Sequence, residues 1–96
     1  MEIGEFQGLI ERTYLERDRA RGMGGTFMWF VEEVGELSTA LRHGTEEEQK
    51  AEFADVLAWL VTLASIQGIK MEEVVTKYAG GCPYCKKMPC ICSQKT

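Results

Sequence analysis

Apolar residues recur every three or four positions along most of the chain, which is the spacing of an amphipathic α-helix. Glycines divide this pattern into separate stretches. The first predicted helix covers about residues 3–19, the second 26–43 with Thr26 as its N-cap, the third 46–67, and a short fourth 71–78. We see no strand pattern and no repeat. The sequence therefore predicts an all-α fold, an antiparallel bundle of about four helices with short connections.

The third predicted helix differs from the others because it is apolar on nearly every side. Of the fourteen residues from Phe53 to Ile66, eleven are apolar. Thr45 followed by Glu48 is typical of a capping box at its start, and Gly68 ends it. A helix of this kind must be covered all round, which two or three short neighbours cannot do. We therefore expect a homodimer or a larger assembly built around this helix.

Composition and charge narrow the class of protein. The chain has 96 residues, enough for one domain, and a formal net charge of −4. This charge gives no electrostatic reason to expect nucleic acid or an anionic membrane as a partner. No apolar run reaches the ~18–20 residues that cross a bilayer, and the charged N-terminus has no signal-peptide core. The expected location is the cytoplasm.

Four carboxylates stand out because they border apolar faces of two neighbouring helices. Glu33 and Glu36 are one turn apart on the second predicted helix, and Glu52 and Asp55 are one turn apart on the third. A lone ionised carboxylate in such a setting costs several kcal/mol. No Lys or Arg lies among the neighbouring positions of either helix. Two ways to avoid this cost remain: a raised pKa of the carboxylates, or binding of a hard divalent cation such as Mg²⁺.

The spacing of these acidic residues resembles the signature of a known protein family. "EEVGE" (Glu32 to Glu36), fifteen residues and then "EFAD" (Glu52 to Asp55) resembles the E-E-x-x-E … E-x-x-D signature of MazG-like nucleoside triphosphate pyrophosphohydrolases. The flanking text "WFVEEVGELSTALRHG" and "ADVLAWLVTLASIQGIKMEEVVTKY" is similar as well. The resemblance extends from about residue 27 to 78.

The resemblance implies an all-α fold, dimers or tetramers, and hydrolysis of a nucleoside triphosphate between its α- and β-phosphates, with Mg²⁺ as cofactor and Mn²⁺ as the alternative. Glu32 would activate water or support the metal ligands. Trp59, one turn after Asp55, would stack on the base or else pack in the core, and Lys77 would contact phosphate. The motif match assigns Mg²⁺ to Glu33, Glu36, Glu52 and Asp55.

This sequence departs from the family pattern at two places. Ser65 stands where many relatives carry Asp or Asn, and few basic residues follow the fourth predicted helix. Lys77, Lys86 and Lys87 are the ones near it. These departures bear on substrate choice more than on the metal site. Neither the base nor the sugar of the substrate follows from the sequence.

The last fifteen residues contain all four cysteines of the chain, in the spacing C-x₂-C-x₄-C-x-C. We divide the chain into a helical domain, residues 1–80, and a cysteine-rich tail, residues 81–96. Such a cluster predicts a structural Zn²⁺ site, because four thiolates leave the ion no open position. Disulfides, with three pairings, stay open as the alternative. The predicted zinc ligands are Cys82, Cys85, Cys90 and Cys92.

Two other functions stay open beside the hydrolase. One is a catalytically inactive helical dimer that acts as a protein-interaction module, with acids kept for metal-dependent stability. The other is a phosphoribosyl-ATP pyrophosphohydrolase, which resembles this fold and acid pattern but shares less of the flanking sequence.

Overall fold

The computed structural model describes residues 1–93. It contains α1 (Ile3–His43), α2 (Glu46–Ile66), α3 (Met71–Val74) and a 3₁₀ helix, η1 (Val75–Tyr78). No strand occurs among the described residues, so the all-α prediction is confirmed. The predicted count of about four helices is not reproduced as such, because residues 1–93 hold three α-helices and one 3₁₀ helix.

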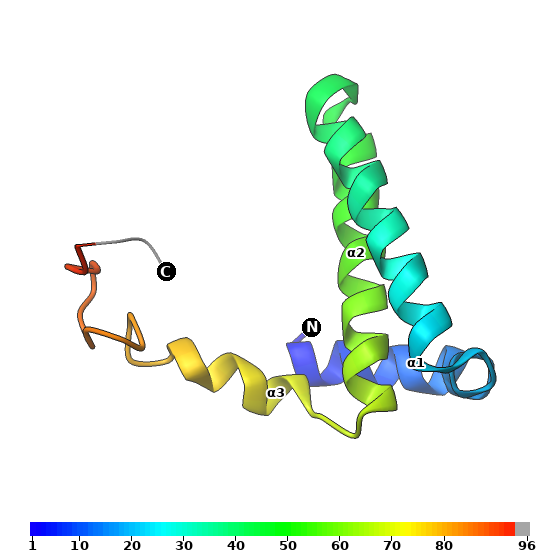
Figure 1. The fold of residues 1–96 in the computed structure, drawn as a ribbon, viewed down its shortest axis with the longest axis horizontal. Coiled ribbons are helices and arrows are strands. Elements are labelled where there is room, and N and C mark those ends of the chain that lie inside the picture. The colour runs from blue at the N-terminus through cyan, green and yellow to red at the C-terminus, as the bar shows by residue number, and fades with distance from the viewer. Residues whose placement is uncertain (94–96) are drawn as a thin grey trace.

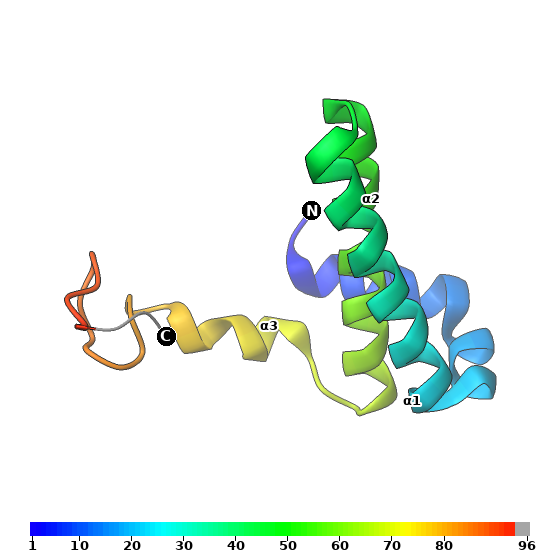
Figure 2. The same ribbon diagram turned by 45° about the horizontal axis from the view of Figure 1, so that its top comes forward.

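The first two predicted helices are joined into α1 with a sharp break at one residue. Gly22 has φ 81° and ψ 173°, which places it outside the helical region. This positive φ favours glycine, because it has no Cβ. The prediction that Thr26 is an N-cap is therefore wrong. Thr26 lies inside α1, and its hydroxyl donates to the Gly22 carbonyl over 2.7 Å. The break lets the N-terminal segment of α1 cross the base of a helical hairpin (Figures 1 and 2).

The hairpin consists of the second segment of α1 and the whole of α2, joined by Gly44 and Thr45. A Cβ at Gly44 would lie 2.8 Å from the Ala40 carbonyl oxygen, so the tight turn requires glycine. The predicted capping box is confirmed: the Thr45 side chain accepts from the Glu48 amide, and the Glu48 carboxylate accepts from the Thr45 amide. This short turn sets the two helices antiparallel and fixes their register.

A buried glutamine fastens the start of α1 to the turn after α2. The Gln7 amide nitrogen donates to the Ser65 hydroxyl over 3.0 Å and to the Ile69 carbonyl over 2.9 Å. The Gln7 oxygen accepts from the Met71 amide over 2.7 Å, and the Ser65 hydroxyl donates to Glu11. Buried polar groups must be paired in this way, so the network holds the crossing segment in place.

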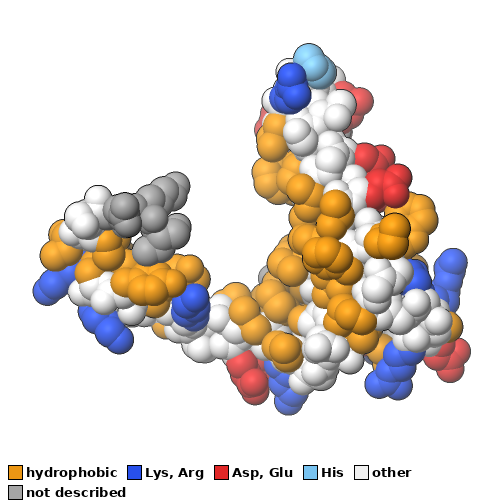
Figure 3. Space-filling view, viewed as in Figure 1, with side chains coloured by type: hydrophobic (Ala, Val, Ile, Leu, Met, Phe, Trp, Pro, Cys, Tyr) orange, Lys and Arg blue, Asp and Glu red, His pale blue; other side chains and the backbone are white. Residues whose placement is uncertain are grey.

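The apolar faces of the hairpin remain largely uncovered in a single chain. The buried apolar residues of the described range are Ala40, Val61 and Met71. Apolar side chains instead run along the hairpin surface (Figure 3). On each helix they follow the three- and four-residue spacing of a single face. The exposed members are Phe27, Val31, Val34 and Leu41 on α1, and Phe53, Leu57 and Leu60 on α2.

α3, η1 and the tail lead away from the hairpin (Figure 1). Among residues 1–93, no single helix is long and apolar enough to cross a membrane. The pair formed by residues 46–66 and 71–78 meets the criterion only together, and the two parts are bent by 101°. Length and composition alone produce that result, and the core helix of a soluble protein meets the same criterion.

Candidate functional site

Three of the four predicted Mg²⁺ ligands meet between the helices of the hairpin. Glu33 and Glu36 come from α1 and Glu52 comes from α2, and one carboxylate oxygen of each lies within 4.8 Å of the other two. Residues three apart on a helix share a face, which brings the α1 pair to one side. Asp55 is outside this mutual distance, but it lines the same pocket as Glu33.

The electrostatics of this acidic cluster are unfavourable without a cation. Burial, followed by the charges of Glu36, Asp55 and Glu52, raises the pKa of Glu33 from 4.5 to about 7. Among residues 1–93, one buried oxygen of Glu33 and one of Glu52 have no hydrogen-bond partner. The ion pairs within residues 1–93 join other residues. A hard divalent ion would satisfy these oxygens and relieve the repulsion, so the residues fit Mg²⁺ or Mn²⁺.

A pocket of about 480 Å³ opens beside the acidic cluster. Glu33 and Asp55 line it together with Trp29, one turn before Glu33, and Trp59, one turn after Asp55. The two indole rings are stacked, with 6.1 Å between centroids and 12° between planes. Trp59, which the sequence indicated as a candidate for base stacking, thus lines a pocket. A pocket with carboxylates and aromatic rings suits a ligand with a metal-bound anionic part and a planar part.

The acidic cluster also borders a second pocket, of about 430 Å³, next to the hairpin turn. Glu36 and Glu52 line this pocket, together with His43 and Gly44. The carboxylates therefore lie between two hollows, and an ion bound there would be reachable from both. A metal that must hold a substrate needs such open positions.

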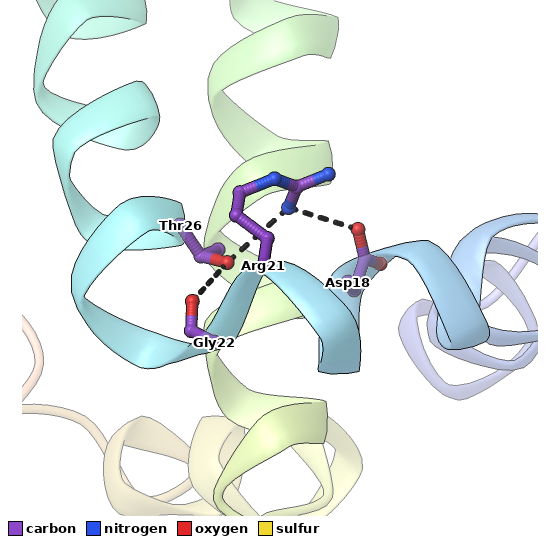
Figure 4. A network of polar contacts seen from close by, with 4 residues as sticks. All are labelled: Asp18, Arg21, Gly22 and Thr26. Carbon is purple, nitrogen blue, oxygen red and sulfur yellow. Dashed lines mark hydrogen bonds and ion pairs between the residues drawn. The ribbon is translucent and has the colours of Figure 1, made fainter.

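Sequence reasoning missed the contribution of the N-terminal segment of α1 to the pocket. Arg17, Asp18 and Arg21 line it. Figure 4 shows Arg21 reaching towards Asp18 and Thr26, with the Gly22 break beside them. The i, i+3 spacing of Asp18 and Arg21, directly before a glycine, is a signal for an ion pair there, although not for its place in the pocket.

Two other predicted site residues lie apart from the acidic cluster. Glu32 is exposed and lines neither pocket. The Lys77 ammonium is 5.7 Å from the ring centre of Tyr78 and 5.9 Å from that of Tyr84, so it faces the tail. The structure of a single chain thus brings neither residue to the 480 Å³ pocket. Their assigned roles stay predictions.

The four tail cysteines come together as the sequence predicted. All are free thiols, and their sulfur atoms lie within 4.8 Å of one another. The sulfurs of Cys82 and Cys92 are 3.8 Å apart and those of Cys85 and Cys90 are 3.9 Å apart. Four thiolates at about 2.3 Å from one tetrahedral ion have edges of about 3.8 Å. The cluster therefore matches the dimensions of a Cys₄ zinc site.

Protonation of the tail thiols is uneven. Hydrogen bonding from the backbone of Ile91, together with other neighbours, lowers the pKa of Cys85 to about 6. Hydrogen bonds with Cys90, Cys82 and Cys85 raise the pKa of Cys92 to about 12. One thiolate is thus available at neutral pH to begin metal binding, since the thiolate is the ligand form.

The comparisons with known proteins agree with this geometry. The family model described as "MazG nucleotide pyrophosphohydrolase domain" matches residues 24–88, which is more than half of the chain. The chain therefore belongs to the MazG nucleotide pyrophosphohydrolase domain family, and the resemblance noted from the sequence is confirmed. A search of curated proteins found no match. Family membership associates the site with nucleotide pyrophosphohydrolysis in general.

Replacing Glu33 with Gln tests the electrostatics of the acidic cluster. Because folding raises the pKa of Glu33 from 4.5 to about 7, the folded protein binds more protons in that interval, and the free energy of unfolding should fall as pH rises through it. Above pH 7, Mg²⁺ should restore stability. Glu33→Gln should weaken both effects because the amide carries no charge. Thermal unfolding across this range, with and without Mg²⁺, measures them.

Glu16→Gln is the control, because Glu16 is an exposed acid of the same helix. It should leave both the pH dependence and the Mg²⁺ effect as in the wild type. Equal behaviour of the two variants would contradict the account of the cluster.

Proposed function

We propose that this protein is a Mg²⁺-dependent nucleoside triphosphate pyrophosphohydrolase. It cleaves the bond between the α- and β-phosphates and releases a nucleoside monophosphate and pyrophosphate. The observation that carries the proposal is the cluster of Glu33, Glu36 and Glu52 beside a pocket lined by tryptophan, with two buried oxygens that have no hydrogen-bond partner among residues 1–93. Membership of the MazG family supports it. Mn²⁺ is the alternative cofactor.

The acidic cluster would hold the cation through carboxylate oxygens, with Asp55 completing the set once an ion draws it in. When bound, Mg²⁺ neutralises phosphate charge and polarises the phosphoryl oxygens. Glu32, which precedes Glu33 in the sequence and is exposed in the single chain, would accept a proton from the attacking water. Water supplies the new oxygen, and pyrophosphate leaves with the bridging oxygen.

Residues around the pocket would position the rest of the substrate. Trp59 would stack on the base, an interaction worth about 1–3 kcal/mol for an exposed base on an aromatic ring. Lys77 would contact phosphate only in an assembly, since within one chain it faces Tyr78 of η1 and Tyr84 of the tail. A protein of net charge −4 needs such cations and Mg²⁺ to hold a polyanion.

The two alternative functions make different demands on the site. A catalytically inactive interaction module would need neither the 480 Å³ pocket nor the stacked tryptophans beside the acids. A phosphoribosyl-ATP pyrophosphohydrolase would use the same acidic cluster on one specific nucleotide. Pyrophosphate release from a panel of nucleotides separates them: no turnover at all would favour the first, and turnover of phosphoribosyl-ATP alone would favour the second.

We also propose that the tail binds Zn²⁺ through Cys82, Cys85, Cys90 and Cys92, as a structural site. The spacing of the sulfurs supports this. Four protein ligands leave no position for substrate. Free thiols of this kind persist in a reducing compartment, which fits the expected cytoplasmic location.

Exposed apolar faces support a homo-oligomer. Phe53 is 54% exposed, Val31 51% and Leu41 52% in the single chain. These residues belong to the apolar stripes on both helices of the hairpin, and large apolar surfaces of this kind mark protein interfaces. A second copy that packs its own hairpin against them is the proposed partner, in a homodimer or homotetramer. No membrane or nucleic-acid partner is proposed.

Replacing Asp55 or Glu36 with Ala should lower Mg²⁺-dependent turnover by more than about 100-fold, because loss of a ligand exceeds the ~10–100-fold cost of losing its supporting partner. Glu47→Ala removes an exposed acid of α2 and should keep wild-type activity. Pyrophosphate release measures turnover, and circular dichroism checks helix content. Near-normal activity of either variant would show that the ligand assignment is wrong.

Cys85→Ser should remove Zn²⁺ and lower thermal stability while the helices retain turnover. Metal content by mass spectrometry and the unfolding temperature of the full chain provide the measurements. Ser93→Ala, an exposed hydroxyl of the tail, is the control. Loss of turnover in a well-folded Cys85→Ser protein would contradict a purely structural role.

Leu57→Glu places a charge in the apolar stripe of α2 and should shift the protein towards monomer. Desolvating an unpaired carboxylate in an interface costs several kcal/mol. Sedimentation velocity measures the distribution, and Gln67→Glu at the exposed end of α2 serves as the control. A wild-type protein that sediments only as a monomer would refute the oligomer.

A further inference from the structure

We propose that the ion pair of Asp18 and Arg21 recognises the nucleobase in the 480 Å³ pocket and so determines base specificity. The inference rests on the proposed function in taking the ligand to be a nucleotide. Both residues line the pocket. They belong to the segment before Gly22, which lies outside residues 24–88 that match the family.

Arg21 is held in one orientation by three neighbours. Its Nη1 donates to Asp18 Oδ1 over 3.1 Å and to the Thr26 hydroxyl over 3.2 Å. Its guanidinium carbon lies 4.8 Å from the Trp59 ring centre. Thr26 is fully buried and is itself fixed to the Gly22 carbonyl (Figure 4). A donor group held in place before the ligand arrives loses less conformational entropy on binding.

The pair still has hydrogen-bonding capacity for a ligand. A guanidinium has five N–H donors, and within residues 1–93 the hydrogen bonds of Arg21 use only Nη1. Asp18 is 5% exposed, and its carboxylate accepts from Arg21 alone among these residues. The pocket wall therefore presents free donors next to a carboxylate acceptor, while the stacked tryptophans supply an apolar surface.

A neutral planar base suits this position better than a phosphate does. The charge of Arg21 is already balanced by Asp18, and a nearly buried carboxylate would repel a phosphate placed beside it. The acidic cluster with its cation offers the phosphates a separate place. A nucleobase edge carries a carbonyl or ring-nitrogen acceptor together with an N–H donor in most cases, which complements guanidinium and carboxylate.

Base discrimination then follows from unpaired polar groups. A base that cannot pair with Arg21 and Asp18 leaves buried donors or acceptors unsatisfied, which weakens its binding. Sites built from hydrogen bonds reject the wrong partner for this reason, whereas apolar contacts alone discriminate weakly. The tryptophans would hold any base, and the ion pair would choose among them.

Intrinsic fluorescence gives a direct assay, because the chain has two tryptophans and both line this pocket. The full chain is titrated with adenosine, guanosine, cytidine, uridine and thymidine without metal. It is titrated separately with pyrophosphate and Mg²⁺. The variants are Arg21→Met, which keeps the length of the side chain without donors, and Arg19→Met, an exposed arginine of the same segment that does not line the pocket.

We expect wild type and Arg19→Met to bind one or two nucleosides more tightly than the rest. Arg21→Met should weaken the preferred nucleoside roughly tenfold, which corresponds to ~1.4 kcal/mol, and should reduce the differences between bases. The affinity for pyrophosphate with Mg²⁺ should stay at the wild-type value. An unchanged ranking of bases in Arg21→Met would overturn the proposal, and so would an equal loss of pyrophosphate affinity, which would assign Arg21 to the phosphates.

Arg21→Lys and Asp18→Asn keep the test decisive if Arg21→Met does not fold. Lys retains the positive charge but lacks the planar guanidinium group. Arg21→Lys should therefore fold, with the wild-type circular dichroism spectrum, but should not show the wild-type ranking of bases. Asp18→Asn should change which nucleoside is preferred. A wild-type ranking in both folded variants would show that the pair is structural only.

The outcome is separable from that of the hydrolase assay. Selective nucleoside binding that depends on Arg21, in a protein that hydrolyses no nucleotide, would support base recognition and refute the proposed reaction. Hydrolysis of all nucleotides at the same kcat/KM would refute base recognition and leave the proposed reaction in place.

Discussion

Repulsion among carboxylates held close together on two antiparallel helices is the constraint on which the rest of the site depends. One carboxylate oxygen each of Glu33, Glu36 and Glu52 lies within 4.8 Å of the other two, and in the described part of the chain buried oxygens of Glu33 and Glu52 have no hydrogen-bond partner. The cost is visible in the pKa of Glu33, which burial and neighbouring charge raise to about 7. An apolar core would be stabler than such an arrangement, and this cost is the reason we propose that the cluster binds an ion.

The fold holds the two helices of the acidic cluster in a fixed register and leaves the outer apolar faces of the hairpin exposed. A tight turn at Gly44 and a capping box at Thr45 fix the register that brings α1 and α2 acids together. The break at Gly22 returns the N-terminal segment across the base of the hairpin, where Gln7 ties it to the turn after α2. That segment forms part of the wall of the 480 Å³ pocket. The outer apolar faces, by contrast, stay open to a partner.

Much of this could be predicted from the sequence, because helical periodicity and capping are local properties. The bounds of α2, its capping box and the short helix near Met71 follow from such patterns. The approach of the acids followed from their spacing on two adjacent helices. The glycines near residue 22 indicated a break between two helices, but its backbone conformation could not be predicted, because a positive φ at one glycine does not change the spacing of apolar residues. For that reason Thr26 was wrongly predicted as an N-cap. The contribution of Arg21 to the pocket depends on a crossing angle that the sequence does not encode locally.

Manganese binding to the metal-free chain tests the central claim most directly. The account predicts saturable binding of Mn²⁺, seen as loss of the electron paramagnetic resonance signal of the free ion, with proton release when the titration is made below about pH 7, since Glu33 is then protonated. Glu33→Gln should abolish the proton release and weaken the affinity. A free-ion signal that stays undiminished in the presence of excess protein would contradict the account.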